Sequence, residues 1–297
     1  MIDQWAADAS TRGLSGQTIY TYAKGLRGFS KFLGRPIEGA SKMDVRAYVD
    51  LQRKNKATTR TIRGRLNALS SFYEFLMFEG IRSDNPVQEV RKRYLTQYKA
   101  SSEEHTHKLI SVEDMARLVN GMIDIRNKAM LLVMAKTGVR RGELLSMEVR
   151  DINWQNQSIL LKEKRKRSNR IVFFDDETAY VLRRWLEIRK SRAPRDQSLW
   201  IDTCGKRIGS GALRHNIEKA AVLCGLHDPD SDRMEDHFTS HCCRHWMATH
   251  LLRAGMNRDY VKWLRGDVMK EAIDVYFHID PDDVRKAYLA HVPQLGV

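Results

Sequence analysis

The stretch HCCRHWMATHLLRAGMNRDYVKWLRGDVMKEAIDVY, residues 241–276, decides how the fold is interpreted. His241 and Arg244 stand three residues apart in a segment of helical period, so their side chains share one helix face. Gly255 ends this helix, and a second amphipathic run leads to Asp267, with apolar positions Tyr260, Val261 and Leu264. Tyr276 follows nine residues after Asp267. A His-x-x-Arg pair alone usually marks a solvated face and a lone Tyr usually packs, so order and spacing together indicate a site.

The stretch TGVRRGELL, residues 137–145, lies about a hundred residues upstream and supplies a second motif. Gly138 permits a positive φ, which predicts a tight turn at the end of an apolar helix. Arg140 follows directly, and a second helix begins at once, so its guanidinium can point inward from a corner. Glu143 could orient Arg140 or satisfy backbone N–H groups, and the second role is favoured.

These two motifs together resemble the tyrosine recombinase (phage integrase) family. That family carries a Thr-Gly-x-Arg box, a hairpin Lys, a His-x-x-Arg box, a Gly-His step and a Tyr nine residues later. The resemblance implies that Arg140 and Arg244 bind phosphate, that His241 is their partner and that Tyr276 is the nucleophile. Asp267 departs from the pattern, because the family usually has His or Trp there. It would hydrogen-bond an arginine or the phosphate through water, or cap a helix. LRGD at 264–267 and EAI at 271–273 are similar to archaeal members.

A basic turn lies between two segments rich in β-favouring residues, 158–162 and 169–174, which predicts two or three strands. Such a tract is usually a solvated turn or a nonspecific phosphate contact. The resemblance places the family's catalytic Lys on this hairpin, where Lys166 is the best match and Lys164 the alternative. The neighbouring Arg165 and Arg167 are expected to contact DNA.

Residues 1–95 carry amphipathic patterns that predict a compact unit of four or five helices. Ser15 is expected to cap one helix, Ser41 another, and Thr58 or Thr59 a third. Segments 14–22 and 84–86 also resemble the SAM-like core-binding domain of the same family. A run of basic residues with no acidic residue among them needs a counter-charge, which DNA phosphate supplies. This predicts a DNA clamp formed by Arg53, Lys54, Lys56, Arg60, Arg63 and Arg65.

The tract 96–108 is polar and lacks periodicity, so it is interpreted as a linker between two domains. Residues 109–297 are expected to form a mixed helical catalytic domain with a small antiparallel sheet and a C-terminal helix. Ser111 and either Asp175 or Asp176 should cap helices, and Pro281 should begin the last one. The resemblance favours exchange of that helix between protomers, with docking on its own domain as the alternative. The predicted fold class is mainly α (α+β).

Composition indicates a polyanionic partner. The 297 residues include 51 Lys plus Arg against 37 Asp plus Glu, a net charge of +14, which favours nucleic acid ahead of an anionic membrane. The 4 cysteines show no Cys-x-x-Cys spacing, so neither a zinc site nor a disulfide framework is expected. No apolar run reaches membrane-spanning length and no signal-peptide layout is present, which predicts a cytoplasmic protein.

The sequence predicts no cofactor and no metal site. It lacks a phosphate-binding Gly-x-x-x-x-Gly-Lys loop and a His-Glu-x-x-His motif. The acidic loop 228–236 begins like a calcium loop, but Arg233 stands where that loop needs Gly and Thr239 where it needs Glu.

These observations and the resemblance predict a site-specific recombinase, or integrase, that acts as a homo-tetramer on two DNA duplexes through a 3′-phosphotyrosyl intermediate. A related topoisomerase that relaxes DNA and a DNA-binding regulator with a decayed active site are the alternatives. Trapping covalent protein on nicked DNA would separate the enzyme from the regulator.

Overall fold

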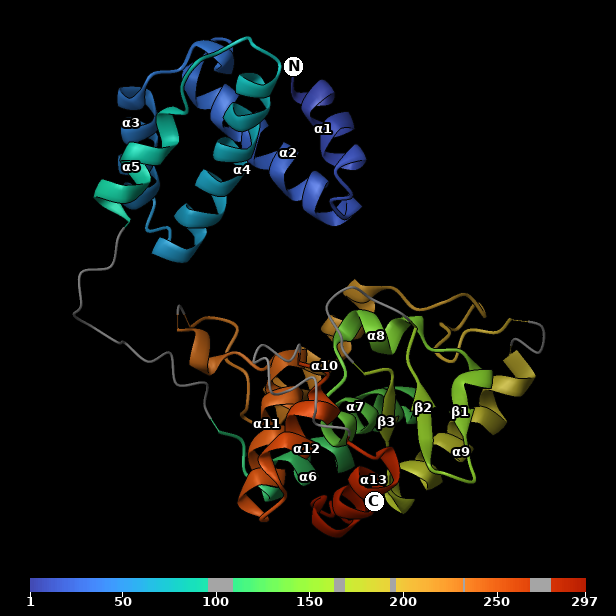
Figure 1. Ribbon diagram of the computed structural model, residues 1–297. Coiled ribbons are helices and arrows are strands. Elements are labelled where there is room, and N and C mark those ends of the chain that lie inside the picture. The colour runs from blue at the N-terminus through green and yellow to red at the C-terminus, as the bar shows by residue number, and fades with distance from the viewer. Residues whose placement is uncertain (96–108, 163–168, 193–195, 232, 268–278) are drawn as a thin grey trace. The chain divides into compact units, whose positions relative to one another are not determined.

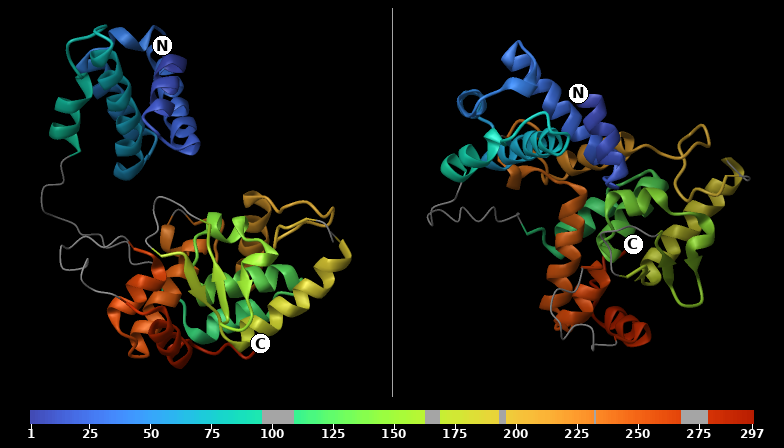
Figure 2. Two further views of the ribbon diagram at one scale, coloured as in Figure 1. Left: turned by 45° about the vertical axis from the view of Figure 1, so that its right-hand side comes forward. Right: turned by 45° about the horizontal axis from the view of Figure 1, so that its top comes forward.

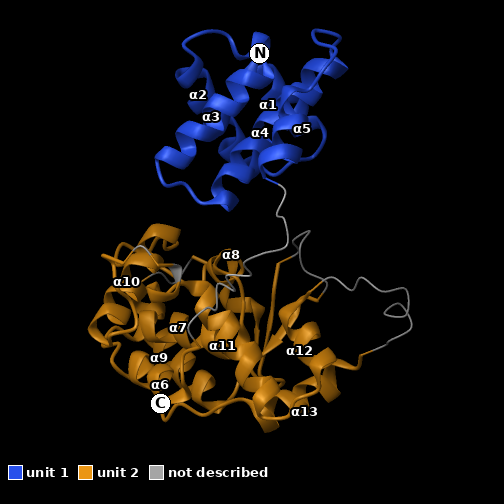
Figure 3. Ribbon diagram, turned by 90° about the vertical axis from the view of Figure 1, so that its left-hand side faces the viewer, with its two compact units in different colours: residues 1–101 blue, residues 102–297 orange. Residues whose placement is uncertain are grey.

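The computed structural model describes residues 1–95, 109–162, 169–192, 196–231, 233–267 and 279–297. The chain divides into two compact units, residues 1–101 and 102–297 (Figure 3). The predicted linker, 96–108, lies outside the described residues. Within the ranges given above, no helix is long and apolar enough to cross a membrane.

The described residues of unit 1 form helices joined by short loops (Figure 1). Its elements are α1 (Ile2–Thr11), α2 (Gly16–Leu33), η1 (Ile37–Gly39), α3 (Lys42–Lys54), α4 (Thr59–Phe78) and α5 (Pro86–Tyr94). The oxygens of Ser15, Ser41 and Thr58 each accept a backbone N–H in the first turn of the helix that follows, which confirms these caps and selects Thr58 over Thr59. The apolar faces of these helices meet in one core that includes Trp5, Phe29, Phe72 and Tyr73.

α1 precedes the first helix that the sequence patterns indicated. Trp5 is fully buried, and its indole N–H donates to the Ser71 hydroxyl of α4 at 3.3 Å. Burying one large aromatic side chain supplies enough apolar contact to hold a short helix that is marginal alone. Packing against α2 and α4 therefore accounts for a helix that its own sequence did not suggest.

Unit 2 is built around α7 (Ile125–Thr137), whose residues 129–137 are all buried. The other helices in the described part of this unit are α6 (Val112–Asn120), α8 (Arg141–Ser146), η2 (Val149–Asp151), α9 (Asp176–Arg192), α10 (Ser210–Leu223), η3 (Met234–Asp236), α11 (Ser240–Arg253), α12 (Arg258–Arg265) and α13 (Pro281–His291). Ser111 caps α6, and Asp175 accepts the Thr178 N–H at 3.1 Å to begin α9. Both expected caps are confirmed, with Asp175 chosen over Asp176.

The sheet of unit 2 has three antiparallel strands in the order β1 (Ile152–Asn153), β2 (Ser158–Leu160) and β3 (Ile171–Phe173). Its register pairs Ile159 with Ile152 on one side and with Val172 on the other. The strands lie side by side in Figure 1 and in the left view of Figure 2. The fold is therefore mainly helical with a small antiparallel sheet, as predicted.

Candidate active site

Arg140 stands at the corner between α7 and α8. Gly138 closes α7 in the left-handed conformation at φ 62°, and Arg140 is the N-cap residue of α8 two positions later. The Arg140 side chain is one-third exposed (33%), so part of its guanidinium remains open to a ligand. The sequence placed this arginine in a corner between two helices, and the structure has it there.

Glu143 holds Arg140 in two ways. Its Oε2 accepts the Arg140 backbone N–H at 2.7 Å, and its Oε1 accepts the guanidinium Nη1 at 3.0 Å. The carboxylate is almost fully buried. The backbone role favoured from the sequence is present, and the orienting role weighed against it is present as well. A carboxylate fixed at both oxygens gives the arginine fork a defined direction.

Arg244 lies on α11 and is buried at 8% exposure. Its Nη1 donates to the Gly138 carbonyl at 2.9 Å, and its Nη2 donates to the Arg265 carbonyl at 2.6 Å. These two bonds tie α11 to the end of α7 and to the end of α12. Since Gly138 is two residues before Arg140, the turn of the first motif and the arginine of the second are in direct contact.

Gly138 favours that contact. A Cβ added there would lie 2.2 Å from the Met247 Cε and 3.7 Å from the Arg244 Cγ, both on α11. The positive φ also disfavours any residue with a side chain. Glycine thus allows α11 to approach the turn closely enough for Arg244 to reach its carbonyl.

Asp267 pairs with arginines. Its Oδ1 lies 3.1 Å from the Arg244 Nη2, its Oδ2 lies 3.2 Å from the Arg265 Nε, and its side chain is 35% exposed. The Asp267 backbone N–H donates to the Lys262 carbonyl just beyond the C-cap Gly266. Of the roles considered from the sequence, contact with an arginine is the one that the geometry shows.

His241 lies in the first turn of α11 and is exposed. Its backbone N–H donates to the capping hydroxyl of Thr239 at 3.3 Å. Arg244 follows one turn later on the same helix, as the spacing predicted. The neighbouring Cys243 is fully buried, and burial raises the pKa of its thiol, so it is held as the inert thiol rather than the reactive thiolate.

The candidate nucleophile Tyr276 and the hairpin residues Lys164, Arg165, Lys166 and Arg167 lie outside the described residues. The strands that flank the hairpin turn are described, and Leu161 continues their pairing by donating to the Arg170 carbonyl at 2.6 Å.

The base of the hairpin is anchored to two neighbouring elements. Asn169 donates to the Trp263 carbonyl of α12 at 2.6 Å. Lys162 pairs with Glu148, and this hydrogen bond lowers the pKa of that carboxyl. The base of the hairpin is therefore held beside α12, the helix whose Arg265 carbonyl accepts a hydrogen bond from Arg244.

The six basic residues that the sequence predicted as a DNA clamp differ in their surroundings. Arg53 donates to the Tyr94 carbonyl at 2.9 Å and Arg63 to the Leu95 carbonyl at 3.1 Å, so both hold the end of α5. Lys54, Lys56 and Arg60 are exposed, and Arg65 is partly buried. The sequence treated all six as one DNA-facing set, and two of them also have a structural task.

The acidic loop 228–236 closes on itself. Arg233 pairs with Asp236 at 2.9 Å and with Glu235 at 3.2 Å, and the Asp228 N–H donates to the Asp236 carbonyl. Its carboxylates are thus partly neutralised within the loop.

Sequence reasoning missed Lys136 on α7, which is fully buried with Asp175 and Glu177. A single lysine inside the apolar run LLVMAKTG was the signal available, because a buried lysine requires acidic partners elsewhere in the chain.

Comparison with known proteins places both units in one family. The sequence pattern described as "Phage integrase family" matches residues 93–282, and that described as "Phage integrase, N-terminal SAM-like domain" matches residues 2–80. Tyrosine recombinase XerC of Psychromonas ingrahamii is 28% identical over 289 residues, covering 94% of this chain and 91% of the relative. Tyrosine recombinase XerC of Bacillus subtilis is 26% identical over 295 residues, covering 95% and 92%. A lambda integrase dimer bound to a core site aligns with a TM-score of 0.67 at 16% identity, covering 94% of this chain and 97% of that one.

Proposed function

The chain belongs to the phage integrase family of tyrosine recombinases and is a DNA strand-transferring enzyme, and from that premise we propose that it recombines specific DNA sites through a covalent Tyr276 intermediate. The observation that carries this proposal is the hydrogen bond from the Arg244 guanidinium to the Gly138 carbonyl. It joins the helix that carries Arg244 to the turn that carries Arg140. It supports a single phosphate clamp made by Arg140 and Arg244.

The clamp suits the chemistry of phosphodiester exchange. A phosphodiester attacked by a phenolate gains negative charge on its nonbridging oxygens, and fixed guanidinium groups stabilise that charge. Arg140 is directed by Glu143 and Arg244 by protein carbonyls, so neither must reorganise during the reaction. A preorganised clamp of this kind requires no metal.

In the proposed step, the Tyr276 oxygen attacks phosphorus and forms the 3′-phosphotyrosyl bond while the bond to the 5′ oxygen breaks. His241 accepts or hydrogen-bonds the phenolic proton, and Lys166, or alternatively Lys164, donates a proton to the leaving 5′ oxygen. Attack by a 5′ hydroxyl of another strand reverses these bonds. Religation therefore uses the energy stored in the phosphotyrosyl link and no nucleotide.

Asp267 is proposed to position Arg244. It supplies an acceptor to Nη2, and Arg265 compensates the carboxylate charge from its other side. This compensation is what allows a carboxylate beside a phosphate pocket, since an uncompensated one would repel the substrate.

We assign residues 1–95 to a DNA-clamping domain and 109–297 to the catalytic domain. The exposed cations Lys54, Lys56 and Arg60 are the best placed for phosphate, while Arg53 and Arg63 combine that role with holding α5. Arg65, Arg165 and Arg167 complete the proposed DNA-contacting set. Recombination of two duplexes requires four cleavage sites, so the proposed assembly is a homo-tetramer.

A covalent trap tests the proposal. Double-stranded DNA of random sequence is selected for binding, and the bound site is then remade with a nick that lets the released 5′ fragment diffuse away. Wild-type protein should form an adduct that survives denaturation, whereas Tyr276→Phe should bind the same DNA and form none. The matched control is Tyr180→Phe, an exposed tyrosine on α9.

Three outcomes decide among the functions. An adduct formed by the Tyr276→Phe variant would remove Tyr276 from the proposed role. Binding without any wild-type adduct would favour the decayed regulator. Relaxation of supercoiled plasmid lacking the selected site, at the rate seen with the site, would favour a topoisomerase.

A further inference from the structure

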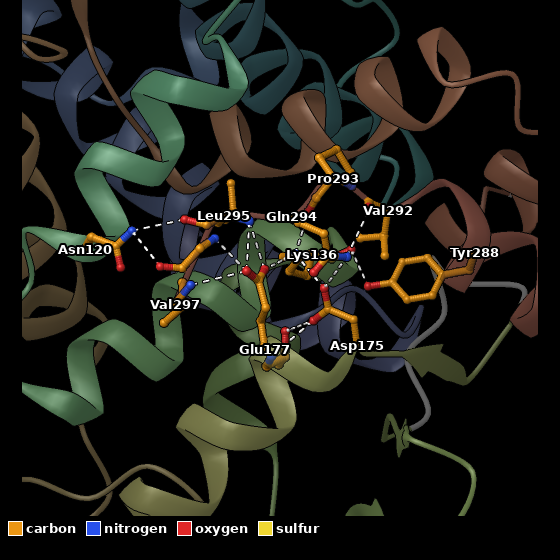
Figure 4. A network of polar contacts seen from close by, with 12 residues as sticks. Asn120, Lys136, Asp175, Glu177, Tyr288, Val292, Pro293, Gln294, Leu295 and Val297 are labelled. Atoms are coloured by element: carbon orange, nitrogen blue, oxygen red, sulfur yellow. Dashed lines mark hydrogen bonds and ion pairs between the residues drawn. The ribbon is translucent and has the colours of Figure 1, made fainter.

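Residues 293–297 lie after α13 and rest against α6, the end of α7 and the start of α9 (Figure 4). Four side chains receive this segment, and they are here called the seat: Asn120, Lys136, Asp175 and Glu177. α13 itself packs on the same unit by burying Val284 and Tyr288. The structure thus shows the docked alternative for this helix.

Lys136 is a fully buried ammonium whose three N–H groups each meet an acceptor. Its Nζ lies 2.5 Å from the Asp175 Oδ2, 2.7 Å from the Glu177 Oε2 and 2.5 Å from the Pro293 carbonyl. An ammonium has three donors, so the segment supplies one third of what Lys136 needs. Removing the segment would leave a buried charged donor unsatisfied, which is strongly unfavourable.

Glu177 binds the backbone of the segment. Its carboxylate accepts the N–H groups of Leu295 at 2.9 Å, Gly296 at 2.6 Å and Val297 at 3.2 Å. Burial raises the pKa of Glu177, but the bonds from Lys136 and from these N–H groups lower it more, so the pKa lies below its usual range. Gly296 has a positive φ of 68°, and a turn of this kind lets three consecutive N–H groups point at one carboxylate.

Two further contacts fix the register of the segment. The Asn120 amide donates to the Leu295 carbonyl at 3.0 Å, and the Leu295 side chain is buried at 4% exposure. An empty seat would leave the Lys136 ammonium and the Glu177 carboxylate without the backbone hydrogen bonds that the segment supplies, which is unfavourable for charged groups away from water. The seat is therefore built to be occupied by a peptide.

The seat is continuous with the phosphate clamp. Lys136 is in the last turn of α7, and its carbonyl accepts the Tyr288 hydroxyl of α13 at 3.3 Å. Two residues further along the same backbone, the Gly138 carbonyl accepts the Arg244 guanidinium. Movement of this turn would displace both the bond to Arg244 and the position of Arg140.

We propose that residues 293–297, by occupying this seat, hold the end of α7 and thereby position Arg140 and Arg244 for DNA cleavage. Lys136 and Glu177 are then positioning residues whose effect depends on whether the seat is filled. This inference rests on the proposed recombinase function, because cleavage is the step that it modulates.

Hydrogen exchange in the full chain tests the seat without any DNA. Glu177→Gln keeps the shape of the side chain but removes the charge that gathers the N–H groups. The amides of 295–297 should exchange about tenfold faster or more in this variant. Glu187→Gln, an exposed acid on the same helix, should leave them unchanged. Unchanged protection in Glu177→Gln would overturn the seat.

Peptide complementation tests the coupling. A chain ended after Val292 should bind the selected DNA as tightly as wild type but form the covalent adduct about tenfold more slowly. Added peptide Pro-Gln-Leu-Gly-Val should restore the rate. A peptide with the Leu amide replaced by an ester lacks one N–H donor to Glu177 and should restore it poorly. Equal rescue by both peptides, or full activity of the shortened chain alone, would overturn the coupling.

Failure of the inference can be told from failure of the proposed function. If the shortened chain fails to fold, Glu177→Gln carries the cleavage test in the full chain, with the same expected loss of rate at unchanged DNA affinity. If wild-type protein forms no adduct, the recombinase proposal fails and the coupling to cleavage fails with it, while the exchange experiment still decides whether Glu177 holds the segment.

Discussion

At the scale of single residues, Arg244 donates hydrogen bonds to two backbone carbonyls and to the Asp267 carboxylate. An arginine has five N–H donors in a planar fork, and these contacts hold the fork of Arg244 in one orientation. The two carbonyls fix its position. The carboxylate adds a charge-assisted bond but also brings a negative charge toward the substrate.

The Asp267 variants separate these two effects. Asp267→Asn keeps an acceptor for Nη2 and removes the charge, so we expect DNA cleavage near the wild-type rate with tighter DNA binding. Asp267→Ala removes the acceptor and should slow adduct formation about tenfold, equivalent to about 1.4 kcal/mol. Both rates are measured on the nicked substrate. If Ala and Asn behave alike, Asp267 does not position Arg244 by hydrogen bonding.

At the scale of elements, the crossing of α7 and α11 depends on Gly138. Its φ of 62° costs a residue with a side chain about 1–2 kcal/mol, and crowding in a packed core adds about 1–3 kcal/mol. We therefore expect Gly138→Ala to lower the free energy of unfolding of unit 2 by about 2–5 kcal/mol and to reduce cleavage. Thermal or denaturant unfolding measures the first effect.

A second substitution separates the cost of crowding from the cost of the positive φ. Met247→Ala removes the methyl group that a Cβ at 138 would meet, but it is itself destabilising because Met247 is buried. Gly138→Ala should therefore cost less in the Met247→Ala background than in the wild type, by the packing part of the loss and not by the backbone part. Gly211→Ala, on α10 with open space around it, serves as the control. Strict additivity of the two substitutions would show that the close approach of Met247 does not limit this position.

The sequence predicted those elements whose signals are local. Caps at Ser15, Ser41 and Ser111 were correct because a side chain and a nearby N–H decide them. α1 was missed because Trp5 is held by other elements, stacking on Tyr22 of α2 and donating to Ser71 of α4, far along the chain. The Lys136 network was missed for the same reason, since its partners come from α9 and from residues after α13.

Within the candidate site, motif spacing placed Arg140 and Arg244 on the correct elements. It could not show that the Gly138 carbonyl joins them, because that bond depends on how closely two helices cross. The contact of Asp267 with two arginines was likewise beyond a pattern. Motif spacing thus brought Arg140 and Arg244 forward as the proposed clamp, and packing supplies the contacts that hold them.

At the scale of the whole molecule, a net charge of +14 predicts DNA binding that weakens steeply with salt. Each phosphate neutralised by a cation contributes about 0.9 to the slope of log affinity against log salt concentration. Unit 1 allows this contribution to be separated from stability, because Arg53 and Arg63 hold the end of α5 through hydrogen bonds that can be removed separately from the exposed cations Lys54, Lys56 and Arg60.

We expect Lys54→Ala, Lys56→Ala and Arg60→Ala each to reduce the salt slope by about one if that side chain contacts a phosphate, with little change in unfolding. Arg53→Ala and Arg63→Ala should instead also destabilise unit 1, by about 0.5–1.5 kcal/mol for each lost hydrogen bond to a carbonyl at the end of α5. Titration of duplex DNA at several salt concentrations, paired with unfolding curves, measures both. If the three exposed cations leave the slope unchanged, this face of unit 1 does not meet the DNA backbone, and the basic surplus must act through unit 2.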